Sequence, residues 1–484
     1  MCAFMNDGSS VTELTETLRR AWERYPTGEK LPSSRALVER YRVSPVTVSR
    51  AIGALAAEGL VVSRPGAGVF RAERRAPSRG GGDLSWQEVT LGAHDALAAP
   101  RADASGLLAT LTLPPADVVD LSSGYPHPSL LPERALADAL ARAARRPDAW
   151  SRPPVEGLPE LRSWFAREIG GPESALSAAD VLITAGGQSA LTVALRALAP
   201  AGAPVLVESP TYPGVLAVAR AAGLRPVSVP VDADGLRTDL LADAFAVTGA
   251  RLLVCQPLFQ NPTGAMLAAG RRAEVLRLAR AAGAFVVEDD YARLLAHADA
   301  PALPRPLAAD DPDGVVVHVR SLTKAASPSL RIAALSARGP VFERLRATQA
   351  VDSFFVPRPL QDATLELVSA PAWARHLRSL AATLSERRAA LGAALARGLP
   401  DLPPAPLAPG GYLAWLPLPS GSDEASVASA ALRAGVAVTP GAAYFAAEPP
   451  APHLRLTHVA AVSSAQLAEG VARLGQAWAS LRQG

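Results

Sequence analysis

Short apolar runs alternate with longer helical stretches through the middle of this chain, and this alternation limits the fold more than any other feature. Five of the runs are apolar on both faces, as strands buried within a parallel sheet are. They are Val181–Thr184, Val205–Glu208, Leu252–Cys255, Phe285–Glu288 and Val315–Val319. Most of the segments between them hold roughly 10 to 20 residues with helical periodicity, which is the spacing of β-α-β units. The sequence therefore predicts an α/β domain with a mainly parallel sheet.

The two ends of the chain follow other patterns, and 484 residues are too many for one hydrophobic core. Near the C-terminus, strand-like Tyr412–Leu416 and Leu454–Thr457 and a final helix from Ala465 predict a smaller α+β domain. The predicted boundaries are 8–72 for an N-terminal domain, 73–117 for a linker and 118–484 for the rest, divided into a large domain at about 140–345 and a small domain at about 346–484.

The N-terminal domain is predicted to hold three helices followed by a two-stranded ribbon. The third helix has the clearest ends, because Ser44 can cap it, Pro45 suits its first turn and Gly59 can end it. Strands at Val61–Ser63 and Val69–Arg71 flank a turn rich in glycine and proline. This order of elements predicts a winged helix-turn-helix.

Charge and surface residues place a DNA-binding site in this domain. The first 75 residues carry a net charge of +4, which leaves −1 for the rest of a chain whose total is +3. In a helix-turn-helix the second helix of the motif enters the major groove, while neighbouring residues and the wing hold phosphates. The candidate DNA-binding residues are Arg35, Ser44, Thr47, Ser49, Arg50, Arg64 and Gly66. On charge alone, a small helical domain with solvated arginines explains the same pattern.

The order of residues favours DNA binding. The stretch LPSSRALVERYRVSPVTVSRAIGALAAEGLVVSRPGAGVF resembles the GntR-family winged helix-turn-helix nearly end to end. The resemblance includes the Leu-Pro-Ser opening, the Ala-Glu-Gly-Leu helix end and the glycine-rich wing, and it implies binding to double-stranded DNA. Pro45 departs from the many members that have a polar, base-reading residue there, so the operator sequence does not carry over.

Lysine is nearly absent, which draws attention to the few positions that keep it. The chain has two lysines, Lys30 and Lys324, among 48 basic side chains, and all the others are arginines. Arginine cannot replace lysine where a neutral amine must act as a nucleophile. Lys324 directly follows a predicted strand, so we expect it at the edge of the sheet where open α/β folds bind ligands.

Other strand ends carry the remaining parts of a pyridoxal 5'-phosphate (PLP) site. Such a site needs a lysine, an acid beside the pyridine nitrogen, a donor to the ring oxygen, an aromatic plate and a phosphate cup. The candidates are Gly186, Gly187, Gln188, Tyr212, Asn261, Asp289, Tyr291, Ser321, Lys324 and Arg331. Taken singly, each of these motifs also fits an ordinary turn or helix cap.

In this order, residues 120–484 resemble the fold-type I aminotransferases, most closely the aminotransferase-like domain of MocR regulators. The resemblance implies Lys324 as the Schiff-base lysine and Asp289 as the partner of the pyridinium. It implies Tyr291 and Asn261 at the ring oxygen and Tyr212 stacked on the ring, with Ser321, Arg331, Gly187 and Gln188 at the phosphate. Arg455 matches the family arginine that takes the substrate carboxylate. Trp150 stands near a position where related chains have a tyrosine that reaches the partner subunit's phosphate, which puts that contact in doubt.

Together these features predict a PLP-dependent transcription regulator that binds operator DNA and senses either an amino compound or PLP itself. The resemblance also implies a head-to-tail homodimer. The main alternative is a working aminotransferase with an accessory DNA-binding domain. A complete set of PLP residues favours neither, whereas an intact wing and a basic N-terminal domain favour regulation.

Composition excludes several other classes. Only Cys2 and Cys255 occur, so a disulfide framework is not expected and a reducing cytoplasm fits best. No apolar run reaches membrane-spanning length, and the start lacks the pattern of a signal peptide. The seven histidines are scattered, so no metal site is expected.

Overall fold

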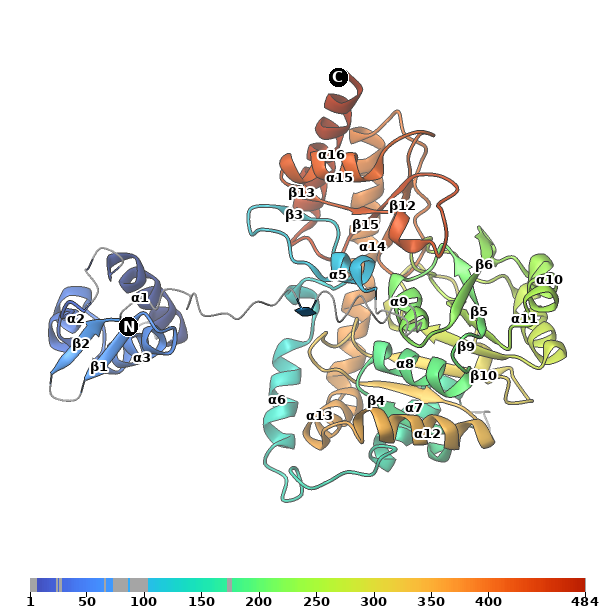
Figure 1. The fold of residues 1–484 in the computed structure, drawn as a ribbon, viewed down its shortest axis with the longest axis horizontal. Coiled ribbons are helices and arrows are strands. Elements are labelled where there is room, and N and C mark those ends of the chain that lie inside the picture. The colour runs from blue at the N-terminus through green and yellow to red at the C-terminus, as the bar shows by residue number, and fades with distance from the viewer. Residues whose placement is uncertain are drawn as a thin grey trace. The chain divides into compact units, whose positions relative to one another are not determined.

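The computed structural model describes residues 7–22, 25, 28–64, 67–72, 86–87, 103–171 and 176–483. The chain forms two compact units, Met1–Ala98 and Ala99–Gly484 (Figure 1). Most of the predicted linker 73–117, and Gly66 of the predicted wing, lie outside the described residues. Each unit is described by itself.

The first unit contains three helices and a β-ribbon, as the sequence predicts. Its elements are α1 (Asp7–Trp22), α2 (Ser34–Tyr41), α3 (Pro45–Ala57), β1 (Val61–Arg64) and β2 (Gly68–Arg71), and β1 pairs antiparallel with β2. The side chains of Leu18, Val48 and Leu55 are fully buried and form the centre of its core. Ser33 caps α2 and Ser44 caps α3, each by accepting a backbone N–H bond. The caps fix where the two helices of the DNA-binding motif begin.

The second unit is built on an eight-stranded sheet in the order β4-β11-β10-β9-β8-β5-β6-β7. The strands are β4 (Val181–Thr184), β5 (Pro204–Ser209), β6 (Arg225–Asp232), β7 (Gly235–Leu236), β8 (Leu252–Cys255), β9 (Phe285–Asp290), β10 (Val316–Ser321) and β11 (Ala333–Ser336). The five strands from β10 to β6 run parallel. Three of these strands were not predicted from the sequence, namely β6, β7 and β11. Strand β11 runs antiparallel between β10 and β4.

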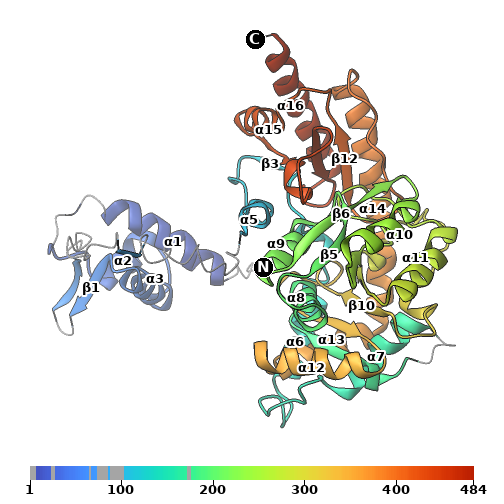
Figure 2. The same ribbon diagram turned by 45° about the vertical axis from the view of Figure 1, so that its right-hand side comes forward.

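Helices cover both faces of this sheet. They are α6 (Glu133–Ala143), α7 (Pro159–Gly170), α8 (Gly187–Leu198), α9 (Pro213–Ala221), α10 (Thr238–Thr248), α11 (Ala269–Ala282), α12 (Pro340–Ser353) and α13 (Arg358–Ser369). Alternate strand residues enter two different apolar clusters, as Leu253 and Val254 do. Figures 1 and 2 show the central strands between α8 and α9 on one side and α10 and α11 on the other. With both faces covered, polar side chains gather at the strand ends.

A smaller α+β layer completes the second unit, drawn in orange to red in Figure 1. It contains α14 (Pro371–Gly398), β12 (Leu413–Pro417), α15 (Glu424–Arg433), β13 (Val436–Ala437), β14 (Thr439–Pro440), β15 (His453–Thr457) and α16 (Ser464–Gln483). The strand order is β12-β15-β14, and β13 pairs with β3 (Val119–Asp120) from the start of the unit. The layer has an apolar cluster of its own.

Two details differ from the predicted boundaries. The predicted small domain starts near residue 346, yet the buried apolar residues of α13 and of the first half of α14 belong to the large sheet's cluster. The predicted linker also ends in a helix, α5 (Ser105–Leu111), which belongs to the second unit. Among the helices that the structure describes, none is long and apolar enough to cross a membrane.

Candidate functional site

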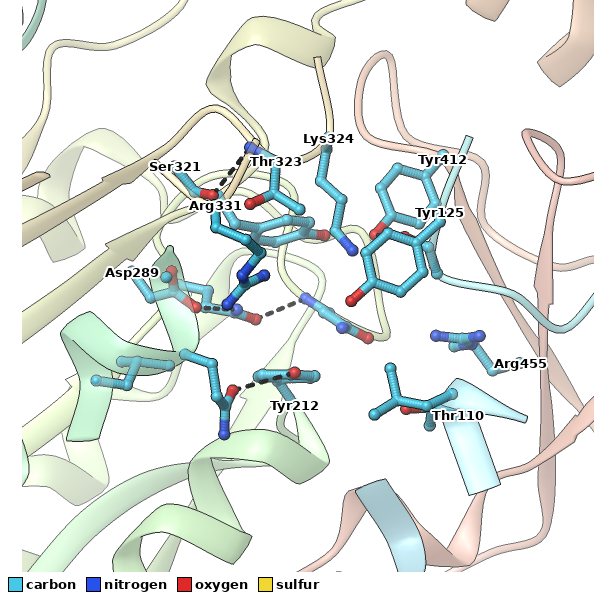
Figure 3. Close-up of a pocket in the computed structure, with 18 residues that line it drawn as sticks. Thr110, Tyr125, Tyr212, Asp289, Ser321, Thr323, Lys324, Arg331, Tyr412 and Arg455 are labelled. Carbon is cyan, nitrogen blue, oxygen red and sulfur yellow. Dashed lines mark hydrogen bonds between the residues drawn. The ribbon is translucent and has the colours of Figure 1, made fainter. Parts of the chain in front are cut away.

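One pocket lies where the parallel strands end, and it collects the predicted cofactor residues (Figure 3). Its lining includes Gly187, Gln188, Tyr212, Asn261, Asp289, Tyr291, Ser321, Lys324, Arg331 and Arg455. The structure thus brings together every predicted PLP residue except Gly186, which lies directly beside Arg331. Strand carboxyl ends converge in this way because parallel strands all point to one edge of the sheet.

The first turn of α8 and Arg331 form an anion cradle. Gly186 has φ +90°, and a Cβ built on it would lie 2.7 Å from Cζ of Arg331. Only glycine permits this close approach of a guanidinium to the backbone. The Nη2 of Arg331 donates to the carbonyl of Ala185 at 2.9 Å, which fixes the guanidinium beside the helix start. The free amides of a helix N-terminus beside a cation suit a phosphate group.

At the other strand ends, Asp289 is held by Gln256, which was not among the predicted site residues. Asp289 is buried, and its Oδ2 accepts a hydrogen bond of 2.7 Å from Nε2 of Gln256. The Oε1 of Gln256 accepts from the backbone N–H of Asn261 at 2.9 Å, so its amide is fixed at both ends. Burial raises the pKa of Asp289 to about 6, while the bond from Gln256 opposes that rise. Gln256 therefore both orients Asp289 and favours its charged form.

Behind Gln256 lies Glu208, which is also buried. Its Oε2 accepts from the backbone N–H of Gln256 at 3.1 Å and from Nε2 of Gln260 at 3.2 Å. Burial raises the pKa of Glu208 to about 8, so this side chain is mainly uncharged at neutral pH. Among the described residues that line the pocket, Asp289 is the one acid, and Glu208 lies outside the lining.

Lys324 enters the pocket between Tyr125 and the strand ends. Its Nζ lies 3.6 Å from the centroid of the Tyr125 ring. Displacement of water by the surrounding protein, and then the charges of Arg455 and Arg331, lower the pKa of Lys324 to about 7. Much of the amine is therefore neutral at physiological pH, as a nucleophile must be.

Arg455 lies on β15 at the far side of the pocket and is only 2% exposed. Its Nη2 donates to the carbonyl of Ser122, and its Cζ lies 5.6 Å from the centroid of the Tyr444 ring. Among the described residues its Nε has no hydrogen-bond partner, and no acid pairs with the guanidinium. A buried cation without a counter-charge is costly unless an anion meets it.

These residues fit PLP. The Arg331 cradle suits the phosphate, Asp289 suits the pyridine nitrogen, and Lys324 offers the amine for the aldehyde. The Oδ1 of Asn261 is buried in the pocket wall without a hydrogen-bond partner among the described residues, so this amide is free to bind a polar ring substituent. When bound, PLP supplies an electron sink for the amine that it holds.

In the first unit, the DNA-binding candidates are found mainly at the surface. Arg35, Ser44, Ser49 and Arg50 are exposed, as is Arg64, whose guanidinium lies 4.8 Å from the centroid of the Phe70 ring. The prediction that Thr47 lies on this surface is wrong. Thr47 is only 4% exposed, because the Ser44 cap takes its backbone N–H and its hydroxyl lies 2.8 Å from that of Ser44.

Several pocket residues lay outside the prediction. Thr110 and Leu111 come from α5, within the segment interpreted as linker, and they line the pocket. Tyr412, predicted only as the start of a strand, is buried and also lines the pocket, where its hydroxyl donates to the carbonyl of Gly124 at 2.9 Å. Gln256 carries no charge and belongs to no recognisable motif, so no sequence signal marked it.

The fold and the pocket define a PLP-dependent, aminotransferase-like protein joined to a winged helix-turn-helix. Residues 116–474 match the family model of class I and II aminotransferases, and residues 13–70 match that of the bacterial regulatory proteins of the gntR family. The chain belongs to the class I and II aminotransferase family and carries a gntR-family DNA-binding domain, which together make a PLP-dependent transcription regulator.

Both kinds of relative are found among known proteins. The chain is 33% identical to the 2-aminoadipate transaminase of Thermus thermophilus, over 81% of this chain and 97% of that protein. It is 31% identical to the vitamin B6 salvage pathway transcriptional repressor PtsJ of Salmonella typhimurium, over 70% of this chain and 74% of that one. The crystal structure of LysN, the α-aminoadipate aminotransferase of Thermus thermophilus, matches 83% of this chain and all of its own with a TM-score of 0.74 and 30% identity.

The lowered pKa of Lys324 predicts a pH-dependent association with PLP. The neutral fraction of the amine increases as the pH rises through about 7, so the association rate constant should increase over the same range and then level off. Stopped-flow absorption at the visible band of lysine-bound PLP measures this rate. The Lys30→Ala variant should behave as the parent, and a midpoint near the ordinary lysine pKa would contradict the assignment.

The bond from Gln256 predicts a second pH effect. In Gln256→Met the pKa of Asp289 should rise above 6, so the PLP dissociation constant should increase about tenfold or more near pH 6 and recover toward pH 8. Spectroscopic titration of the purified protein at several pH values measures it. A loss of affinity that is equal at every pH would show that Gln256 acts only on packing.

Proposed function

We propose that this regulator responds to an amino compound that binds at the PLP pocket, and that the response changes how its winged helix-turn-helix holds operator DNA. The observation that carries the proposal is a complete PLP pocket, with an unneutralised buried arginine, in a chain that also presents a capped recognition helix. A transaminase without a regulatory role does not need a recognition helix.

In the pocket, this chain's own side chains would divide three tasks. Arg455 would bind and orient a carboxylate of the incoming amine through its unpartnered Nε. Asp289, fixed by Gln256, would keep a negative charge at the pyridine nitrogen. Lys324, with a pKa near 7, would accept or release a proton at Nζ once it is free of the cofactor.

Catalytic turnover is the second candidate function, and the lowered pKa of Lys324 favours it as well. A lysine with a pKa near 7 is suited to general base catalysis. The similarity to the 2-aminoadipate transaminase agrees with turnover, whereas the similarity to PtsJ agrees with a response to PLP itself. Relatives therefore do not separate the candidates, and an experiment must.

A head-to-tail homodimer is part of the proposal, with support from exposed apolar side chains. Trp150 is 80% exposed, Val351 82% and Phe354 71%. Arg358 pairs with Asp148 and lies 3.3 Å from the Ser151 hydroxyl, so the segments that carry Trp150 and Phe354 approach one another. Exposed apolar side chains gathered on one surface are typical of a protein interface. Sedimentation of the PLP-loaded protein measures the assembly.

The response to amines can be tested with two measurements on one sample. We expect an amino compound to change the visible spectrum of the PLP-loaded protein and, over the same concentration range, its affinity for a DNA duplex selected from a random pool. In Lys324→Ala the visible band of lysine-bound PLP should be lost, whereas Lys30→Ala should keep it. Steady release of a keto acid with no change in DNA affinity would favour the enzyme, and an effect of PLP alone would favour a PLP sensor.

DNA recognition by α3 predicts the effect of removing one exposed arginine. Arg50→Ala should weaken binding to the selected duplex by about 1 to 3 kcal/mol if its guanidinium contacts a base edge. Fluorescence anisotropy measures the affinity. Arg20→Ala is a matched control, because Arg20 is exposed but paired with Glu16 on α1. An unchanged affinity for Arg50→Ala would place the recognition surface elsewhere.

A further inference from the structure

We infer that the amino compound is an amino acid with a single carboxylate and an uncharged side chain, and that α5 makes this selection. The inference rests on the proposed function, since it concerns the ligand of the same pocket. It depends on which charged groups line the pocket and on what α5 presents to it.

The charges of the pocket are nearly all assigned to the cofactor. Its described lining has four charged side chains, and three of them, Asp289, Lys324 and Arg331, are the partners of PLP. Arg455 is the remaining one. It can neutralise one carboxylate of a bound amino acid, and the described lining offers no further cation for a second carboxylate.

The wall next to Arg455 is formed by α5. Figure 3 shows Thr110 beside Arg455, at the end of the pocket away from Asp289 and Ser321. All seven residues of α5 are uncharged, and so are the next five residues of the chain. The acids that flank this stretch are Asp103 and Asp117, and the Asp103 carboxylate accepts from the backbone N–H of Ser105 at 3.0 Å at the far end of the helix. A ligand side chain that extends past Arg455 therefore meets an uncharged surface.

Three hydroxyl groups of the pocket lining are already engaged within the protein. The hydroxyl of Thr110 donates to the carbonyl of Leu107 at 2.7 Å. The hydroxyl of Tyr412 donates to Gly124, and that of Tyr212 donates to Oε1 of Gln188 at 3.2 Å. Each of these protons already has an acceptor within the protein. An anionic side chain would have to break such a bond or lose water without replacement, which is unfavourable.

An uncharged side chain meets a suitable surface instead. Leu111 lines the pocket and is 46% exposed, and the ring of Tyr125 lines it as well. Contact with a methylene chain or a neutral polar group would cover Leu111 without leaving a charge unpaired. The names of the Thermus relatives do not settle the matter, since both name the dicarboxylic aminoadipate while the LysN structure contains a phosphopyridoxyl-leucine adduct.

Glutamine and glutamate test the inference because they have nearly the same shape and differ in charge. Titrated into the PLP-loaded full-length protein and followed by the visible spectrum, glutamine should bind at least about tenfold more tightly than glutamate. Norleucine and 2-aminoadipate form a longer pair with the same contrast. Thr110→Arg adds a cation to the wall and should reduce or reverse the preference, by about tenfold or more. Leu113→Arg adds the same charge outside the pocket lining, at a side chain that is 80% exposed, and should leave the preference as it is.

The outcomes separate this inference from the function on which it rests. Equal or tighter binding of the dicarboxylic member of each pair by the parent protein would overturn the selection by α5 and leave amine sensing intact. A spectrum that no amino acid changes would overturn amine sensing itself. If Leu113→Arg changes the preference as much as Thr110→Arg does, selection depends on overall charge and not on the α5 wall.

Discussion

Burial of the sheet on both faces is the constraint on which the rest of the second unit depends. Alternate residues of the central strands enter two separate apolar clusters, so neither face can accommodate a water-filled site. Polar groups are confined to the ends of the strands, where β5, β8, β9 and β10 point the same way. A carboxylate, an amine and a phosphate cradle that are far apart in sequence become neighbours there. The position of the site therefore depends on the arrangement of the layers and not on any single residue.

The charged side chains of the pocket favour anionic ligands. Lys324, Arg331 and Arg455 face one charged acid, Asp289, within a small volume, and the acid behind it is mainly neutral because burial raises the pKa of Glu208 to about 8. An excess of positive groups in a concave, partly buried region attracts negative ligands. The phosphate of the cofactor and the carboxylate of an amino acid are the two anions that this arrangement can place, one at each end of the pocket.

The sequence predicted the strands and most of the site because both follow from strong local patterns. Apolar runs located β5, β8, β9 and β10, and the scarcity of lysine pointed to Lys324. The parallel strand β6 was missed because few of its residues are buried. Antiparallel β11 was missed because its direction depends on its neighbours and not on its own residues. Thr47 was misplaced because a cap that turns a hydroxyl inward looks the same in sequence as one that leaves it exposed. Gln256 acquires its role only when β8 and β9 lie side by side.

The helix α5 has few contacts of its own, since none of its seven residues is buried. Helices this short do not hold together in water without tertiary support. Seven residues span about 10 Å as a helix and about 23 Å when extended. A ligand that packs on Thr110 and Leu111 would therefore also support the helix that carries these two residues.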